Sequence, residues 1–259
     1  MRWTQRRRRL AHQVDPGSRQ MRLDEKVALV TGAGRGIGRA CALAFAEAGA
    51  DIVVAARTEE QLADVCGDIE ALGRRCHAVP TDLADGGQVQ RLADEALAAF
   101  GCVDILVNNA GVAIHHPVPD IPTDVWDLTM AVNVRAPFLL TRALWTHMVE
   151  RGGGCILNVA SVSGKRAGAG NATYSASKYA IIGFTESLSK AGREVNIRAC
   201  AVCPGPVATV MRAGNNPSEN PADILTPEDL AELALFVATR PPRVVLQEVV
   251  MELNPSGTG

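Results

Sequence analysis

Short apolar runs alternate along this chain with longer stretches in which apolar residues recur every three or four positions. The short runs are typical of buried parallel strands, and the longer pattern is typical of helices that bury one face. Strands are predicted at 27–31, 51–56, 75–80, 103–107, 154–160, 196–202 and 244–251. Helices are predicted at 36–49, 58–72, 86–100, 123–149, 172–191 and 227–239. The alternation predicts an α/β fold with one doubly wound parallel sheet of about seven strands and helices on both faces.

Composition limits the function classes. The chain has 259 residues, 47% hydrophobic content and a formal net charge of −2, which is typical of a globular domain and implies no nucleic-acid partner. No apolar run approaches the roughly 20 residues that span a bilayer, so no membrane partner is expected. Residues 1–22 are rich in Arg, and we expect a disordered basic tail before a domain at 23–259. Met21 is a candidate start, and a mitochondrial presequence or a nucleic-acid-binding arm are less favoured readings of the tail.

The chain contains seven Cys, scattered mostly inside predicted strands and helices. An odd, scattered set predicts reduced, buried thiols in a cytoplasmic protein. Cys200 and Cys203 have the spacing of a metal-binding pair, but they lie in a strand without a second pair. We therefore expect core residues there and no metal site.

Tyr174 and Lys178 carry the first candidate chemistry. Residues four apart lie on the same face of a helix, so an ammonium can act on the phenol. A phenol titrates near pH 10, and a neighbouring cation moves its pKa toward neutrality. Tyr174 is therefore a candidate proton donor, with a surface Tyr beside a solvated Lys as the alternative.

A glycine-rich turn follows the first predicted strand. Residues 31–38 read TGAGRGIG between the apolar run 27–30 and an Ala-rich helix pattern. Strand, glycine turn and helix in this order place backbone N–H groups and a helix N-terminus where a pyrophosphate could bind. Alone, the same pattern is also compatible with a tight strand-to-helix connection.

These motifs together resemble those of the short-chain dehydrogenase/reductase family. The chain also has NNAG at 108–111, MAVNV at 130–134 and PGPVAT at 204–209, in the family's order. Ser161 precedes Tyr174 by thirteen residues, the family's usual offset, and Ser163 is the rival. The resemblance implies a single Rossmann-type domain that transfers a hydride between a nicotinamide cofactor and a carbonyl or secondary alcohol.

The resemblance also implies residue roles. Ser161 would hold the substrate oxygen, Tyr174 would protonate it, and Lys178 would hold the ribose and lower the phenol pKa. Asn133 would anchor a water that links Lys178 to solvent. The implied cofactor-binding residues are Gly32, Gly34, Arg35, Gly36, Ile37, Gly38, Arg57, Asp82, Leu83, Asn109, Ala110, Gly111, Tyr174, Lys178, Pro204, Gly205, Val207 and Thr209.

The charges near the second predicted strand indicate which cofactor is used. In dinucleotide-binding folds an acid at the end of that strand holds the ribose hydroxyl, whereas an Arg accommodates a 2′-phosphate. Positions 55 and 56 are both Ala, and Arg57 and Arg35 lie nearby. We therefore expect NADP(H), unless both arginines are ordinary surface charges.

The sequence says less about the substrate and the assembly. Residues 208–225 are expected to form a small mobile lid, while 112–121, with His115 and His116, and 162–170, with Lys165 and Arg166, line the entrance. We interpret these polar residues as a wet rim, although the two cations would suit an anionic carrier-linked substrate. The C-terminus lacks the D-G-G turn that is frequent in 3-oxoacyl-carrier-protein reductases.

We therefore expect a carbonyl reductase or alcohol dehydrogenase, with a 3-oxoacyl-(carrier protein or CoA) reductase as the alternative enzyme. An idle NADP-sensing or scaffold protein is the alternative of another class. Homo-oligomers are expected through 123–149 and 172–191, with apolar positions at Phe138, Leu139, Ile182 and Phe184.

Overall fold

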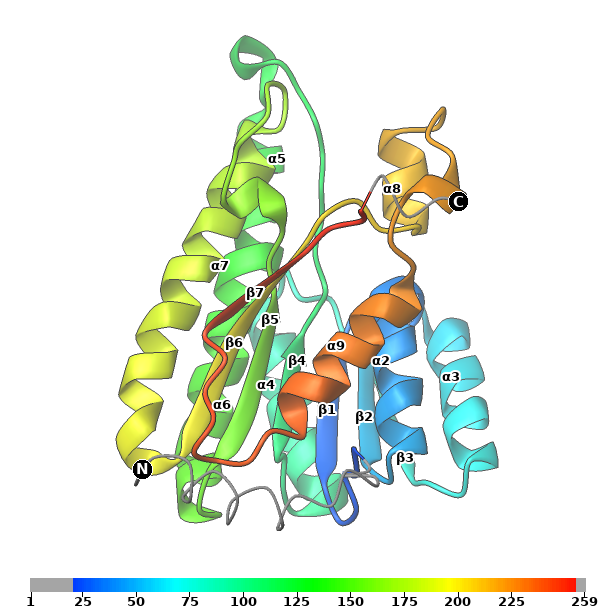
Figure 1. The fold of residues 1–259 in the computed structure, drawn as a ribbon, viewed down its shortest axis with the longest axis vertical. Helices are drawn as coiled ribbons and strands as arrows, with labels where there is room; N and C mark the ends of the chain where they lie inside the picture. Colours follow the sequence, from blue (N-terminus) through cyan, green and yellow to red (C-terminus); the bar gives the residue numbers. More distant parts are fainter. Residues whose placement is uncertain (1–20, 255–259) are drawn as a thin grey trace, which may run out of the picture.

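The computed structural model describes residues 21–254 as one seven-stranded sheet with every strand parallel to its neighbours (Figure 1). The strands are β1 (Val27–Thr31), β2 (Asp51–Ala56), β3 (Cys76–Pro80), β4 (Ile105–Asn108), β5 (Gly154–Val159), β6 (Ile197–Pro204) and β7 (Glu248–Met251). Their order in the sheet is β3-β2-β1-β4-β5-β6-β7, so the strand order reverses next to β1. The predicted doubly wound α/β fold is confirmed.

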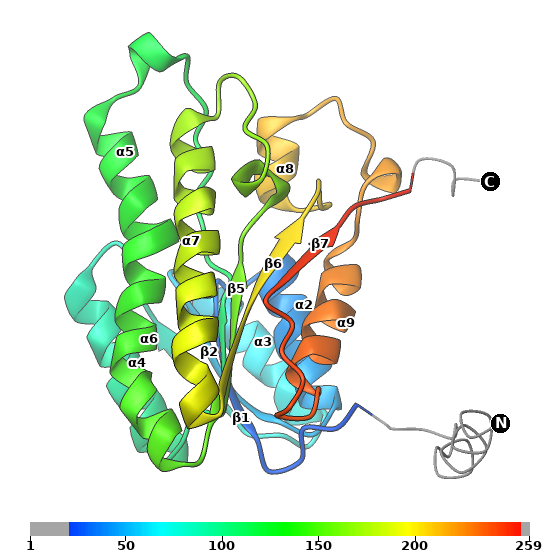
Figure 2. The same cartoon turned by 60° about the vertical axis from the view of Figure 1, so that its left-hand side comes forward.

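Helices cover both faces of the sheet. The helices are α2 (Gly36–Glu47), α3 (Glu59–Ala71), α4 (Gly86–Phe100), α5 (Thr123–Met130), α6 (Ala136–Glu150), α7 (Ala172–Ala191), α8 (Val210–Asn215) and α9 (Pro227–Ala238). Figure 2 shows α2, α3 and α9 on one side of the sheet and α4, α6 and α7 on the other. Successive strand residues supply the two cores, since Ala28 and Val30 pack with the first group while Val27 and Leu29 pack with the second.

The strand and helix boundaries agree with the predictions to within a few residues, with two differences. The predicted helix 123–149 is divided, because residues 131–135 form a π-helical segment between α5 and α6. The expected lid contains the short helix α8, which the sequence pattern did not predict. The predicted basic tail lies almost wholly outside the described residues. Within those residues, no helix is both long and apolar enough to cross a lipid bilayer.

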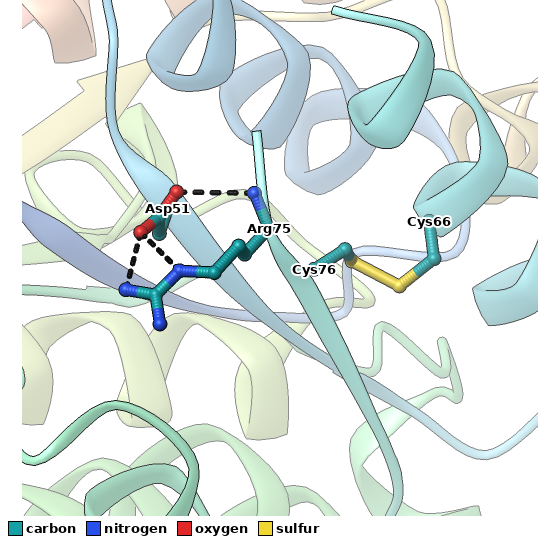
Figure 3. Close-up of a disulfide and its surroundings, with 4 residues drawn as sticks. All are labelled: Asp51, Cys66, Arg75 and Cys76. Atoms are coloured by element: carbon teal, nitrogen blue, oxygen red, sulfur yellow. Dashed lines mark hydrogen bonds and ion pairs between the residues drawn. A yellow bond between two sulfur atoms is a disulfide. The ribbon is translucent and has the colours of Figure 1, made fainter. Parts of the chain in front are cut away.

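The prediction of seven reduced, buried thiols was wrong for one pair. Cys66 on α3 and Cys76 at the start of β3 form a disulfide, and both are only half-buried (Figure 3). The other five cysteines are free and buried. The pairing arises because α3 packs along β3, which brings together two residues that are ten apart in the chain. Closing so short a loop contributes about 2 to 3 kcal/mol to the free energy of unfolding.

An ion-pair cluster lies beside this disulfide. The Asp51 carboxylate accepts hydrogen bonds from the backbone N–H of Arg75 at 3.0 Å and from its Nε at 2.8 Å (Figure 3). It also accepts a hydrogen bond from Arg74 Nη2 at 2.8 Å. The start of β2 is thereby attached to the segment that leads into β3. This edge of the sheet is held by both covalent and ionic contacts.

Candidate active site

A pocket of about 600 Å³ lies at the carboxyl ends of the strands, next to the point where the strand order reverses. This is where parallel α/β sheets bind ligands. Of the predicted cofactor-binding residues, all except Gly38 line the pocket. Ser161, Tyr174 and Lys178 line it as well, whereas Asn133 lies just behind its wall.

The turn after β1 is held closely against the end of β4. The hydroxyl of Thr31 accepts hydrogen bonds from the backbone N–H groups of Asn109 at 3.0 Å and Ala110 at 3.1 Å. The Asn109 side chain donates to the carbonyl oxygen of Thr31 at 2.8 Å. A Cβ at Gly38 would collide with the carbonyl oxygen of Gly32, which explains a glycine there although it does not reach the pocket.

The residues of the turn fit a pyrophosphate. Gly36 has φ +56°, which favours glycine, and it is also the first residue of α2. The first turn of α2 has no acidic residue and no side-chain cap, so its N–H groups are free to bind an anion. A Cβ at Gly32 or at Gly34 would lie under 3.0 Å from a neighbouring atom, so the turn has no room for a side chain at either position.

Two arginines lie at this end of the pocket. Arg35 and Arg57 both line it and are exposed, and neither has an ion-pair partner among residues 21–254. The Asp82 carboxylate, also in the lining, accepts a hydrogen bond from the backbone N–H of Ala84 at 3.0 Å. Two unpaired guanidiniums beside a phosphate-sized cradle form a site for additional negative charge.

Tyr174 and Ser161 meet at the other end of the pocket. Tyr174 lies on the first turn of α7, and Ser161 is the residue that follows Ala160 at the end of β5. An interaction with Ser161 acts to lower the pKa of Tyr174, whereas burial, the larger influence, raises it. Ser163 also lines the pocket, and its backbone N–H donates to Ser161 Oγ at 3.1 Å. Both serines therefore lie at this end of the pocket, and the choice of Ser161 over Ser163 stays a prediction.

Lys178 lies beside Tyr174 but gives its hydrogen bond to the backbone. Its ammonium is buried and donates to the carbonyl oxygen of Val159 at 2.7 Å, and it lies 5.5 Å from the centre of the Tyr174 ring. Burial lowers the pKa of Lys178 to about 8. Burial also raises the pKa of Tyr174, while Ser161 and the charge of Arg212 act in the opposite direction. The expected lowering of the phenol pKa by Lys178 stays a prediction.

Asn133 lies in the π-helical segment, where a widened turn is frequently associated with function. Its Nδ2 donates to the carbonyl oxygen of Val112 at 2.9 Å and to Ser177 Oγ at 3.0 Å, while its Oδ1 accepts from the Val112 N–H at 2.8 Å. A Cβ at Gly111 would lie 3.3 Å from Asn133 Oδ1 and 3.8 Å from Lys178 Nζ. The side chain fixes the loop after β4, and the water relay through Asn133 stays a prediction.

The segment that covers the pocket is anchored at several points. Val207 and Leu225 form a parallel bridge at its base, and Asn215 Nδ2 donates to the carbonyl oxygen of Ala113 across the pocket at 3.2 Å. The Thr209 hydroxyl accepts from the N–H of Arg212 at 3.2 Å and so caps α8. The mobility of this lid stays a prediction.

Of the four charged or polar rim residues predicted, His115, His116, Lys165 and Arg166, only His115 lines the pocket, together with Val112, Ala113, Val162 and Ser163 of the same two segments. Lys165 pairs with Glu248 at 2.9 Å, and Arg166 pairs with Glu252. These two cations are therefore held by the last strand and its extension, which leaves the proposed role in binding an anionic carrier without support. Within residues 21–254, no cluster of His, Cys, Asp or Glu side chains is arranged to hold a metal ion.

Comparison with known proteins decides the family. The short chain dehydrogenase model matches residues 26–220. An uncharacterized oxidoreductase of Staphylococcus aureus strain MW2 is 34% identical over 229 residues, which are 88% of this chain and 97% of that protein. This chain belongs to the short-chain dehydrogenase family.

Two solved members of the short-chain dehydrogenase fold differ in cofactor. A blue fluorescent protein from a metagenomic library, in complex with NADPH, is 35% identical with a TM-score of 0.82, covering 88% of this chain and 96% of the other. A 7α-hydroxysteroid dehydrogenase complexed with NADH and 7-oxo glycochenodeoxycholic acid is 30% identical with a TM-score of 0.82, covering 92% and 96%. Similarity to short-chain dehydrogenases does not by itself select the cofactor.

Sequence reasoning missed three residues of this short-chain dehydrogenase site. Thr31 joins the glycine turn to the loop after β4, Arg212 lines the pocket from the lid, and Asn215 connects the lid to the opposite rim. Thr31 had a signal, because it is the last residue of the first strand and precedes the first glycine. Arg212 and Asn215 lie on the short helix α8, whose sequence has no clear apolar periodicity. Neither residue therefore had a signal in the sequence.

Lys178 predicts a specific pH dependence of stability in the cofactor-free protein. Its folded-state pKa of about 8 lies below the ordinary value of 10.5, so the unfolded chain binds more protons above about pH 8 and stability rises with pH through this group. Relative to Lys178→Met, the wild type should gain about 1.4 kcal/mol of unfolding free energy between about pH 7 and about pH 9. Urea unfolding of both proteins at the two pH values measures this. A constant difference would contradict a depressed pKa at Lys178.

Proposed function

We propose that this chain is an NADP(H)-dependent oxidoreductase that interconverts a carbonyl compound and a secondary alcohol. The observation that carries the proposal is that Ser161, Tyr174 and the buried Lys178 line the same pocket as the glycine turn. The pocket can hold a dinucleotide at one end and a small substrate at the other. Membership of the family does not by itself specify the cofactor or the reacting group, and we propose both.

Each side chain has a chemical task in this proposal. Bound NADP(H) supplies or accepts the hydride at the reacting carbon. Ser161 donates a hydrogen bond to the substrate oxygen, and Tyr174 gives its proton to that oxygen in reduction or takes it in oxidation. The raised pKa of Tyr174 keeps the phenol protonated and ready to donate at neutral pH. Lys178 holds the ribose when it leaves the Val159 carbonyl, and it charges near neutral pH because its pKa is about 8.

NADP(H) is proposed over NAD(H) on the basis of charge. Arg35 and Arg57 are unpaired among the described residues, and the position of the ribose-binding acid is Ala56. A dianionic 2′-phosphate would be held by two charge-assisted contacts that a ribose hydroxyl cannot make.

The other enzyme reading, reduction of 3-oxoacyl thioesters on a carrier protein, has less support, because Lys165 and Arg166 are occupied by Glu248 and Glu252. An inactive sensor or scaffold protein would be expected to lack one or more of the catalytic side chains, whereas Ser161, Tyr174 and Lys178 all line one pocket. A turnover screen with NADPH separates the three readings.

A cytoplasmic location is also part of the proposal. Five free, buried cysteines favour a reducing compartment, whereas the Cys66–Cys76 bond is unusual for one.

The catalytic proposal predicts a graded effect of three substitutions. Tyr174→Phe removes the proton donor and little volume, so it should reduce kcat by about 100-fold or more while NADPH binding is retained. Ser161→Ala should reduce kcat far more than Ser163→Ala, which is the matched control. Steady-state kinetics and NADPH fluorescence titration measure these effects. Activity of Tyr174→Phe within a few-fold of the wild type would overturn the mechanism.

A homo-oligomer is proposed through the surface of α5, α6 and α7, which lie side by side (Figure 2). Phe138 is 43% exposed and packs edge-to-face with Phe184 at 6.2 Å between ring centres, and Trp126 is 42% exposed on α5. Light scattering should give a dimer or tetramer for the wild type and a smaller mass for Phe138→Asp. Leu72→Asp, on a similarly exposed Leu at the end of α3, should leave the mass unchanged. A monomeric wild type at micromolar concentration would refute the proposal.

The cofactor proposal predicts a preference of about tenfold or more for NADP(H), measured as the ratio of kcat/KM for the two cofactors. The double variant Ala56→Asp, Arg57→Gln should reverse the ratio, because the new acid repels the phosphate and accepts the ribose hydroxyl. Arg39→Gln is a matched control, since Arg39 is exposed on α2, pairs with Asp68 and lies outside the pocket. Equal use of both cofactors by the wild type would show that Arg35 and Arg57 are ordinary surface charges.

A further inference from the structure

Arg212 is the charged residue that the catalytic scheme leaves without a task. It lies on α8 in the segment that covers the pocket, and it lines the same cavity as Ser161 and Tyr174. Its side chain is 32% exposed, so it is neither in the core nor fully solvated. Arg212 and the residues of the proposed proton transfer therefore face one cavity.

The charges of the pocket are divided between its two ends. Arg35, Arg57 and Asp82 lie around the glycine turn, and Lys178 is buried on the Val159 carbonyl. Among the described residues that line the pocket, Arg212 is therefore the one Arg, Lys, Asp or Glu that remains available to contact a substrate. A single exposed guanidinium beside apolar and neutral neighbours is a typical arrangement for fixing the orientation of an anionic ligand.

The guanidinium already holds a carboxylate. Arg212 Nε lies 2.5 Å from Glu219 Oε2, and Arg212 Nη2 lies 2.6 Å from Glu219 Oε1. This is the parallel two-bond geometry in which Arg recognises carboxylates. Glu219 belongs to the same lid, seven residues further along the chain. The Arg212 guanidinium is thus held in a conformation that could also bind the carboxylate of a ligand.

Exchange of Glu219 for another carboxylate would cost little. The Glu219 side chain is 26% exposed, and ion pairs that remain in contact with solvent are weak because water competes for both partners. The displaced Glu219 carboxylate could return to water. A substrate carboxylate that is held in the covered pocket is less screened, so its contact with Arg212 is stronger.

We propose that Arg212 binds a carboxylate of the substrate, so that the enzyme interconverts oxo acids and hydroxy acids, and that Glu219 occupies the guanidinium when no acid is bound. The inference rests on the proposed function. In the reduction direction, a hydride supplied by bound NADPH would form the new C–H bond at the carbonyl carbon, and the Tyr174 phenol would give its proton to the oxygen and become a phenolate, while the carboxylate on Arg212 is unchanged. Arg212 thereby determines which carbonyl compounds are turned over.

The competing explanation is that the Arg212–Glu219 pair only keeps the lid folded. Under that explanation, loss of Arg212 would raise KM for charged and neutral substrates equally, and exchange of the two residues would restore activity. Under the proposal, loss of Arg212 acts on acids alone. The exchange Arg212→Glu, Glu219→Arg would preserve an ion pair in the lid but abolish the preference for acids.

The experiment compares a series of short-chain oxo acids with their methyl esters, which carry the same carbonyl without the charge. The wild type should have a higher kcat/KM for the acids. Arg212→Gln should lower kcat/KM for the acids by about tenfold or more, mainly through KM, and change the value for the esters by less than about threefold. Glu219→Gln should lower KM for the acids. Arg39→Gln is the matched control, because Arg39 is also ion-paired, with Asp68, but lies outside the pocket.

Two controls keep the outcomes distinct. NADPH binding and thermal unfolding of each variant show whether the fold and the cofactor site are retained. A wild type that reduces esters and neutral ketones but not acids, or an equal loss on both substrate classes in Arg212→Gln, overturns the role of Arg212. A wild type that reduces no member of either class with NADPH contradicts the proposed function itself.

Discussion

The close contact between the turn after β1 and the end of β4 is the constraint on which the pocket depends. Thr31 binds two backbone N–H groups of the neighbouring loop, and Asn109 binds the Thr31 carbonyl in return. These bonds are mostly shielded from water, so breaking them would leave unsatisfied polar groups. The contact sets the direction in which the glycine turn enters α2 and the position of the loop that Asn133 fixes from behind.

From this contact the pocket extends in two directions with different chemistry. Toward β2, the pocket is bordered by exposed arginines, by the N-terminus of α2 and by the glycines of the turn, which suits a ligand with several phosphates. Toward α7 and α8, the groups are a hydroxyl pair, a buried amine and one guanidinium. The buried amine and the phenol both have their pKa shifted by desolvation toward the neutral form. The same low exposure that shifts these groups also keeps water from competing for the proton.

Much of this could be predicted from the sequence because the pattern is local. The strands at 27–31 and 51–56 have the predicted bounds, since each is a compact apolar run between polar turns. The residues around Tyr174 lie together because parallel strands place their carboxyl ends at one edge. The predicted family and fold class are confirmed by the comparisons and the sheet topology.

What could not be predicted depends on contacts through space. The π-helical turn around Asn133 shifts the helix by a fraction of a turn, and apolar periodicity over 123–149 does not register so small a change. The disulfide requires knowledge of how α3 packs on β3. The position of Arg212 in the pocket depends on the fold of the lid, and the hydrogen bond of the Lys178 ammonium to the Val159 carbonyl depends on how α7 packs against the end of β5.

The ion pairs of Lys165 and Arg166 with Glu248 and Glu252 connect the loop after Ser161 to the last described strand. β7 pairs only with β6 and is the final strand of the sheet (Figure 1). A ribosome delivers this segment after every residue of the pocket. The loop that follows Ser161 therefore acquires its outer support after the rest of the pocket has been synthesised, and a nascent chain that has not yet reached Glu248 lacks both ion pairs.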